Sequence, residues 1–86
     1  MSDLLFDLEI VRPSESKKIS IFWVDIEGVS GNFVVGPNHS PLISVIKPQS
    51  FLIYKTSSNE EVRLEIVGGG IININENGKV VVILDN

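Results

Sequence analysis

Cysteine is absent from this chain, and histidine occurs once, as His39. Without cysteine there is no disulfide framework, no thiolate zinc site and no thiol nucleophile. A lone histidine with no paired carboxylates beside it is a poor metal ligand set, so we expect no metal. The absence of cysteine suits a reducing compartment.

Basic residues are also few. Seven Lys and Arg stand against eleven Asp and Glu, the net charge is −4, and Lys17-Lys18 is the only adjacent basic pair. Nucleic-acid binding requires a concentrated basic face. The composition therefore excludes a nucleic-acid partner.

No long hydrophobic run is present. None of the apolar stretches approaches the ~18–20 residues that a membrane-spanning helix requires. The chain starts Met1-Ser2-Asp3 and soon reaches Asp7 and Glu9, which is unlike the basic start and apolar run of a signal peptide. We expect neither secretion nor direct insertion into a membrane.

What is present is a high apolar content in a short chain. The 86 residues suffice for one domain, 1–86, and 43% of them are hydrophobic. The mean hydropathy of +0.25 is high for a small water-soluble domain. It indicates either apolar surface that a partner covers or a sheet that is apolar on both sides.

Nearly every segment has the alternation of a β-strand, and none has a helical period. In the first segment, for example, Phe6, Leu8 and Ile10 alternate with Asp7 and Glu9. The expected strands span Leu4–Val11, Lys18–Glu27, Phe33–Val35, Pro41–Ile46, Phe51–Thr56, Val62–Val67, Ile71–Ile74 and Val80–Leu84. Short strands separated by Gly, Pro and Asn turns predict a small antiparallel sandwich or barrel.

Two of the expected connections carry specific signals. The triple glycine Gly68–Gly70 predicts a sharp bend or bulge. Glu76-Asn77-Gly78 predicts a type I′ hairpin turn.

The segment Lys18–Glu27 is apolar on both of its faces. A strand of this kind lies between two layers or beneath a partner. Its Trp23 has two interpretations, since tryptophan both fills cores and anchors interfaces; we favour the core.

A proline-rich loop separates the strands that end at Val35 and begin at Pro41. Pro37 and Pro41 each fix their own φ and favour extended conformations in the residue before them. Asn38 tolerates a left-handed conformation. A rigid loop that presents His39 between two strands predicts a docking surface.

Catalytic groups are scarce. Adjacent residues of an extended loop point in opposite directions, so Ser40 cannot easily meet the imidazole of His39. The carboxylate pairs Asp7/Glu9 and Asp25/Glu27 are explained by solvated strand faces, and Gly68–Gly70 is not followed by the Lys-Ser/Thr of a phosphate-binding loop. We expect no catalytic residue, no cofactor and no small-molecule ligand.

Read in order, several motifs resemble one known family, the ATP synthase epsilon subunit, in its N-terminal β-sandwich domain. The motifs are Leu8-Glu-Ile-Val11, Gly31, Pro37-Asn-His-Ser-Pro-Leu42, Ile46-Lys-Pro48, Gly69-Gly70 and Val80-Val-Val-Ile-Leu-Asp85. The resemblance runs through essentially the whole chain. It implies an all-β fold, a flattened antiparallel β-sandwich of about ten short strands.

The chain departs from the family pattern at several positions. Asn32 occupies an acidic position that in the family lies near the polar loops of the rotor ring, and Gln49 replaces the glycine after Lys-Pro. Family members usually continue into a two-helix hairpin that regulates or inhibits ATP hydrolysis. No sequence for it follows here, so we expect this chain neither to bind ATP nor to inhibit the enzyme.

The resemblance implies a non-catalytic central-stalk subunit of a rotary F-type ATP synthase, which couples ion-driven rotation to ATP synthesis or hydrolysis. Its partners would be the gamma subunit, facing His39 and Ser44, and the ring of c subunits, facing Gly31 and Asn32. It would lie peripherally on the cytoplasmic face of a bacterial inner (plasma) membrane. Two alternatives stay open, namely a free-standing sandwich adaptor with another protein partner and a small enzyme with a pocket around His39.

Overall fold

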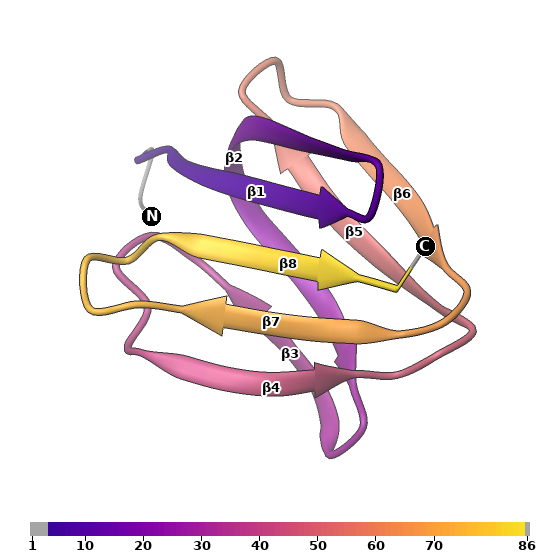
Figure 1. The fold of residues 1–86 in the computed structure, drawn as a ribbon. Coiled ribbons are helices and arrows are strands. Elements are labelled where there is room, and N and C mark those ends of the chain that lie inside the picture. The colour runs from indigo at the N-terminus through magenta and orange to yellow at the C-terminus, as the bar shows by residue number, and fades with distance from the viewer. Residues whose placement is uncertain (1–3, 86) are drawn as a thin grey trace.

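The computed structural model describes residues 4–85, all of them in strands, turns and loops (Figure 1). Eight strands are present: β1 (Phe6–Arg12), β2 (Glu15–Gly28), β3 (Gly31–Val35), β4 (Leu42–Ile46), β5 (Ser50–Thr56), β6 (Glu61–Ile66), β7 (Gly70–Ile74) and β8 (Val80–Leu84). The all-β prediction is confirmed and each expected segment contains a strand. Met1–Asp3 and Asn86, the ends of the expected domain, lie outside the described residues.

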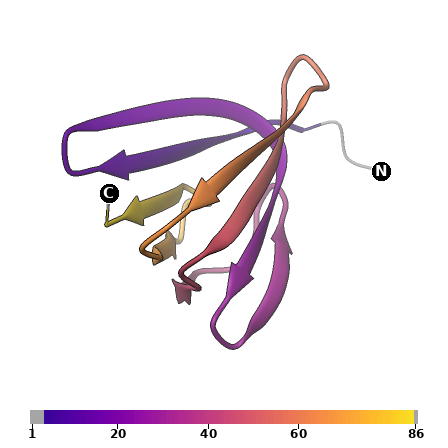
Figure 2. The ribbon, with the colours of Figure 1, turned by 90° about the vertical axis from the view of Figure 1, so that its right-hand side faces the viewer.

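The strands form two layers that share β2 (Figure 2). The first layer has the order β1-β8-β7-β4, with the beginning of β2 beside β1. The second layer has the order β3-β2-β5-β6. The first half of β2 pairs with β1, whereas its second half pairs with β3 and β5. This single strand serves both layers, and the count is eight rather than the ten or so that the resemblance implied.

The two apolar faces of β2 follow from this double role. The pairing of β2 with β5 shifts register between Ile21 and Trp23, a bulge at which the side-chain alternation changes. Trp23 is half-buried and outside the core cluster, so the core interpretation of this residue is wrong. The bulge sends Val24 and Ile26 to the interior instead.

One pair of strands is parallel. β1 and β8 run in the same direction, with Leu8 opposite Val80 and Ile10 opposite Val82, whereas the other pairs are antiparallel (Figure 1). The antiparallel arrangement that we expected thus describes every pair of these strands except this one. A parallel pair needs a long connection, and six intervening strands separate β1 from β8.

The core lies between the layers and draws on both of them. Its buried members are aliphatic apart from one tyrosine: Leu8, Ile10, Ile21, Val24, Ile26, Val35, Ile46, Leu52, Tyr54, Ile66, Ile72, Ile74, Val80, Val82 and Leu84. In β6 the alternation of the segment matches its burial, since Ile66 is buried and Arg63 and Glu65 are exposed.

The two turns with specific signals differ in outcome. Gly68–Gly70 carries the chain from β6 to β7, and Gly69 has a φ of 77°, so the predicted bend is confirmed. The prediction of a type I′ turn is wrong. Such a turn needs a positive φ at both central residues, but Gly78 is left-handed (φ 78°) and Asn77 is not. The Gly78 N–H donates to the Asn75 carbonyl, and the Asn75 side chain accepts from the N–H groups of Asn77 and Lys79, which favours a longer loop.

Candidate interaction surface

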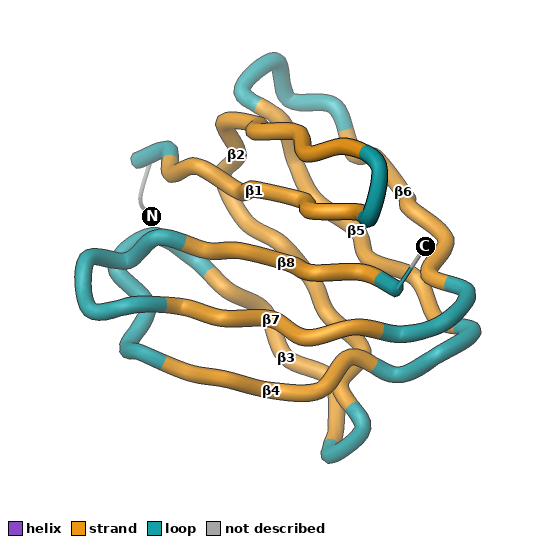
Figure 3. The backbone as a smooth tube through the Cα atoms, in the orientation of Figure 1, coloured by secondary structure: helices purple, strands orange, loops and turns teal. Residues whose placement is uncertain are grey.

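The loop 36–41 connects an edge strand of one layer to an edge strand of the other (Figure 3). Asn38 adopts a left-handed conformation, which its residue type tolerates, with a φ of 59°. This residue packs beside the β7–β8 turn, where a Cβ on Gly78 would lie 3.9 Å from its Cα. The loop therefore has a defined shape, because Pro37 and Pro41 restrict its backbone and Asn38 contacts the β7–β8 turn.

His39 is half-buried in this loop and bonds within it. Its Nδ1 lies 2.7 Å from the carbonyl oxygen of Ser40. Because a carbonyl only accepts, Nδ1 carries the hydrogen and Nε2 is the ring nitrogen left for another molecule. This bond holds the imidazole against its own loop.

Ser44 is half-buried in the middle of β4 and shares its side of the strand with Leu42 and the buried Ile46. A Cβ on Gly28 would lie 3.6 Å from its Oγ, which places Ser44 beside the last residue pair before the β2–β3 turn, Gly28 and Gly31. Its side chain is thus directed toward the opening between the layers rather than onto the outer face of β4.

Gly31 and Asn32 are exposed at the tip of the β2–β3 hairpin. Gly31 has a φ of 136°, which side chains rarely adopt, and Asn32 lies opposite Glu27 of β2. Figure 3 shows this tip and the loop 36–41 as separate parts of the surface, joined by β3 and β4. The four expected site residues therefore belong to one continuous segment but do not form one cluster.

Sequence reasoning missed a group of exposed apolar side chains near this segment. On the outer side of the β4-β7-β8 layer lie four of them, with exposed fractions from 45% to 72%, and we call them the apolar face: Ile43, Val45, Ile71 and Ile83. The signal was present, because Leu42–Ile46 is apolar on both faces like Lys18–Glu27, but only the longer strand was interpreted in that way.

The arrangement offers little for chemistry. Two surface hollows, of about 140 and 310 Å³, are present, and His39 lines neither of them. Among residues 4–85 no group of three or more His, Asp or Glu is placed to hold a metal ion. The same residues include no helix long and apolar enough to cross a membrane.

The fold has counterparts in solved ATP synthases. The chain overlays completely on a chain of the Euglena gracilis mitochondrial ATP synthase structure of OSCP, F1 and c-ring, covering 56% of it (TM-score 0.86, 18% identity). It also overlays completely on 67% of a chain of the Tetrahymena thermophila mitochondrial ATP synthase central stalk and c-ring structure (TM-score 0.80, 9% identity). At these identities the likeness concerns the fold.

Sequence comparison goes further. The chain is 32% identical over 77 residues to the ATP synthase epsilon chain of Rhodopseudomonas palustris (strain BisA53), with 88% of this chain and 55% of the relative covered. It thus spans about half the length of that relative. The model of the ATP synthase delta/epsilon chain β-sandwich domain matches residues 5–86. The chain therefore belongs to the family of ATP synthase delta and epsilon chains, whose epsilon chains are not themselves catalytic, and it comprises the β-sandwich domain of that family.

Proposed function

We propose that this chain is a central-stalk subunit that binds the gamma subunit and the c-subunit ring of a rotary ATP synthase. The observation that carries the proposal is the match of the family model to residues 5–86, which includes the whole sandwich. In this role the domain is a rigid bracket that helps to couple ion-driven rotation to ATP synthesis or hydrolysis. A close-packed double layer suits that role because it deforms little under load.

We place the gamma-facing surface around His39 and Ser44. The loop of His39 is braced by its prolines and by the contact of Asn38 with the β7–β8 turn. A preorganised loop of this kind loses little conformational entropy on binding. The free Nε2 of His39 is the group it offers to the partner.

The test is binding of this chain to the gamma subunit from the same genome, measured by calorimetry. We expect saturable one-to-one binding, weakened by His39→Ala. Ser58→Ala, in the exposed β5–β6 turn, is the control and should bind like the wild type. If the wild-type chain fails to bind at micromolar concentrations, the stalk assignment is wrong and the free-standing adaptor becomes the better interpretation.

We place the ring-facing rim at Gly31 and Asn32, on the tip of the β2–β3 hairpin. Since the chain has no cysteine, a single introduced thiol reports one position without background. We expect Asn32→Cys to crosslink to a c subunit in the assembled complex and Ser58→Cys, in the turn at the opposite end of the view in Figure 1, not to do so. Equal crosslinking of both would remove the rim assignment.

The proposed stalk role also predicts where the chain lies in the cell and whether it needs a metal, a cofactor or a small-molecule ligand. A subunit held between gamma and the c-ring is peripheral to the membrane, and we propose the cytoplasmic face of a bacterial inner membrane as its place. The described residues carry no metal-ligating cluster, and the proposed role needs neither a cofactor nor a small-molecule ligand.

A further inference from the structure

One continuous segment of the chain carries no formal charge. From Gly28 to Ile46 the sequence contains no Asp, Glu, Lys or Arg, although the chain as a whole has seven basic and eleven acidic residues. This uncharged segment comprises β3, the loop 36–41 and β4. It thus contains two edge strands, one from each layer.

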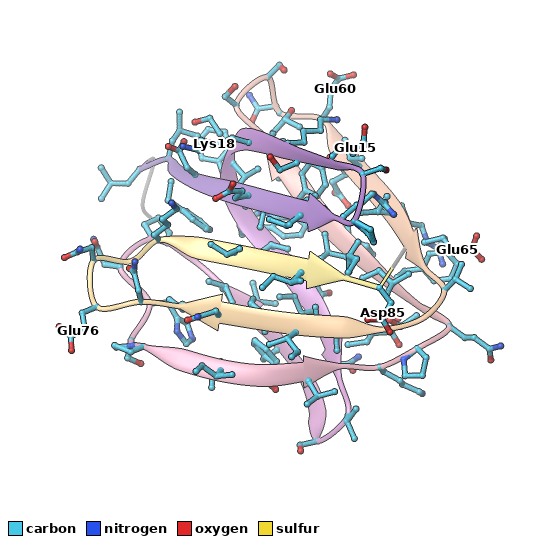
Figure 4. All side chains as sticks on the ribbon, viewed as in Figure 1. Glu15, Lys18, Glu60, Glu65, Glu76 and Asp85 are labelled. Carbon is cyan, nitrogen blue, oxygen red and sulfur yellow. The ribbon has the colours of Figure 1, made fainter. Side chains whose placement is uncertain are left out.

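The other two edges are charged. The outer edge of the second layer is β6, with Glu61, Arg63 and Glu65 exposed along it. The far edge of the first layer is the beginning of β2, with Glu15 and Lys18 exposed, and Figure 4 shows both side chains on that strand. Charged residues on an edge strand prevent pairing with another chain. The protein protects these two edges in that way and leaves β3 and β4 without such protection.

The backbone of β4 is open at one end of its free side. β4 pairs with β7 along its whole length but with β2 only at Ile46, opposite Gly28. On that side the Val45 carbonyl accepts from the N–H of Val29, 3.0 Å away. Residues two apart in a strand point their backbone groups to the same side. Ile43 therefore directs its N–H and C=O away from β7, and within residues 4–85 no strand pairs with it there.

The side chains of this edge continue a wider apolar surface. Val45 lies directly opposite Ile71, and Ile71 lies opposite Ile83. These three and Ile43 form the apolar face, and Ile43 is the most exposed of them at 72%. A strand added beside β4 would extend this face by one more row.

We propose that an extended, uncharged segment of the gamma subunit adds to the edge of β4 and packs its apolar side chains alongside the apolar face. This inference rests on the proposed stalk function and specifies how the partner is recognised. Main-chain hydrogen bonds to Ile43 supply the affinity, and alternate apolar side chains supply the specificity. A charged segment is disfavoured, since the uncharged segment offers no counter-ion and burial of an unpaired charge is costly.

The first experiment measures binding of the cognate gamma subunit to Ile43→Lys and Val45→Lys. Both side chains are exposed, so the fold tolerates the change, and we expect the dissociation constant to rise about tenfold or more. Val67→Lys is the matched control, because Val67 is exposed to the same 56% as Val45 but lies in the β6–β7 connection. It should bind like the wild type.

The second experiment measures amide hydrogen exchange in the free chain and in the complex. We expect the Ile43 amide to exchange rapidly when free and to be protected on binding gamma, because it becomes a donor to the added strand. The Val34 amide of the other edge, β3, is the internal comparison and should change little.

The outcomes separate this inference from the proposed function. Gamma binding that is equally strong in all three lysine variants would overturn the strand addition and leave the stalk function intact. Absence of binding by the wild type would remove both. A concentration-dependent dimer of the wild type that Ile43→Lys disperses, with gamma binding unchanged, would make a second copy the occupant and overturn the proposal.

Discussion

Gln49 has a left-handed backbone, with a φ of 54°, at the position where the family pattern has glycine. In this turn the Ser50 hydroxyl donates to the Lys47 carbonyl at 2.6 Å. A left-handed conformation costs a residue with a Cβ roughly 1–2 kcal/mol. This chain therefore stores strain between β4 and β5.

We expect Gln49→Gly to raise the free energy of unfolding by about 0.5–1 kcal/mol, measured by urea denaturation. The matched control is Asn59→Gly, in the β5–β6 turn with a φ of 66°. Asparagine tolerates this conformation better than glutamine does, so the control should gain less. An equal gain in the free energy of unfolding at both positions would mean that Gln49 is no more strained than Asn59.

Tyr54 is the only tyrosine and is almost fully buried in the core. Burial raises its pKa above the ordinary value of 10.0, because the charged phenolate is poorly solvated there. The unfolded chain therefore releases this proton at lower pH than the folded chain does. The stability that Tyr54 contributes is complete below pH 10 and is lost as the pH rises toward the folded-state pKa.

We expect the alkaline fall in stability to become shallower in Tyr54→Phe, measured as the urea midpoint between pH 9 and 11. Absorbance titration of the single tyrosine in the native protein should give a pKa above the ordinary value. A native titration at or below the ordinary value would contradict the burial argument.

At the scale of elements, the crossing from β6 to β7 depends on close backbone packing at glycine. A Cβ on Gly70 would clash with the carbonyl oxygen of Ile83, which cannot move without breaking the β7–β8 pairing. Glycine is thus required at position 70 by its neighbours in the sheet, since its φ is not positive.

We expect Gly70→Ala to lower the free energy of unfolding by about 3 kcal/mol or more. Gly36→Ala is the control, because no atom lies within 4 Å of its Cβ position and its φ is not positive. That variant should stay within about 0.5 kcal/mol of the wild type. Thermal melts of the two proteins make the comparison, and similar melts would refute the steric argument.

A second element-scale feature joins β2 to β5. The Glu27 Oε2 accepts a hydrogen bond of 2.7 Å from the Phe51 N–H near the start of β5. Phe51 also supports the Arg63 guanidinium, which lies 4.0 Å from the centre of its ring. These contacts organise the outer side of the second layer, which is charged where the first layer is apolar.

At the scale of the whole molecule, β2 makes the two layers one cooperative unit. Each layer contains part of this strand, and the core draws side chains from both. Trp23, the only tryptophan, belongs to the part of β2 that pairs with β5. Its fluorescence therefore reports the second layer, whereas circular dichroism reports both.

We expect the two signals to give one coincident transition in urea. Ile72→Ala removes most of a fully buried side chain of β7 in the first layer. The free energy of unfolding calculated from either signal should fall by about 2–5 kcal/mol. The fluorescence of Trp23, in the second layer, would then respond to a cavity in the first layer. A shift in circular dichroism alone would mean that the layers unfold separately.

The alternation in each segment was enough to predict the strands and the inward residues of regular ones such as β6, because period 2 is a local property. Turn chemistry was predicted partly. Asn38 and Gly69 adopt the left-handed conformations that their types allow, whereas the β7–β8 turn depends on hydrogen bonds from the Asn75 side chain that a dipeptide signal does not encode.

The site residues divide in the same way. The braced loop around His39 was visible in the sequence, since proline restricts the backbone wherever it occurs. The exposure of Ile43 and Val45 was not, because a strand with two apolar faces is compatible with burial on both sides. Only the position of β4 at an edge leaves one of its faces uncovered.

The amino-acid sequence by itself determined the all-β class, the family, the rigid loop and the uncharged segment from Gly28 to Ile46, since each depends on residue types and short spacings. Tertiary structure decided the parallel pairing of β1 with β8, the outward position of Trp23, and which strands became unprotected edges. These features depend on which segments meet across the core. Contacts between residues far apart in the chain are set by packing of the whole molecule, and no local pattern records them.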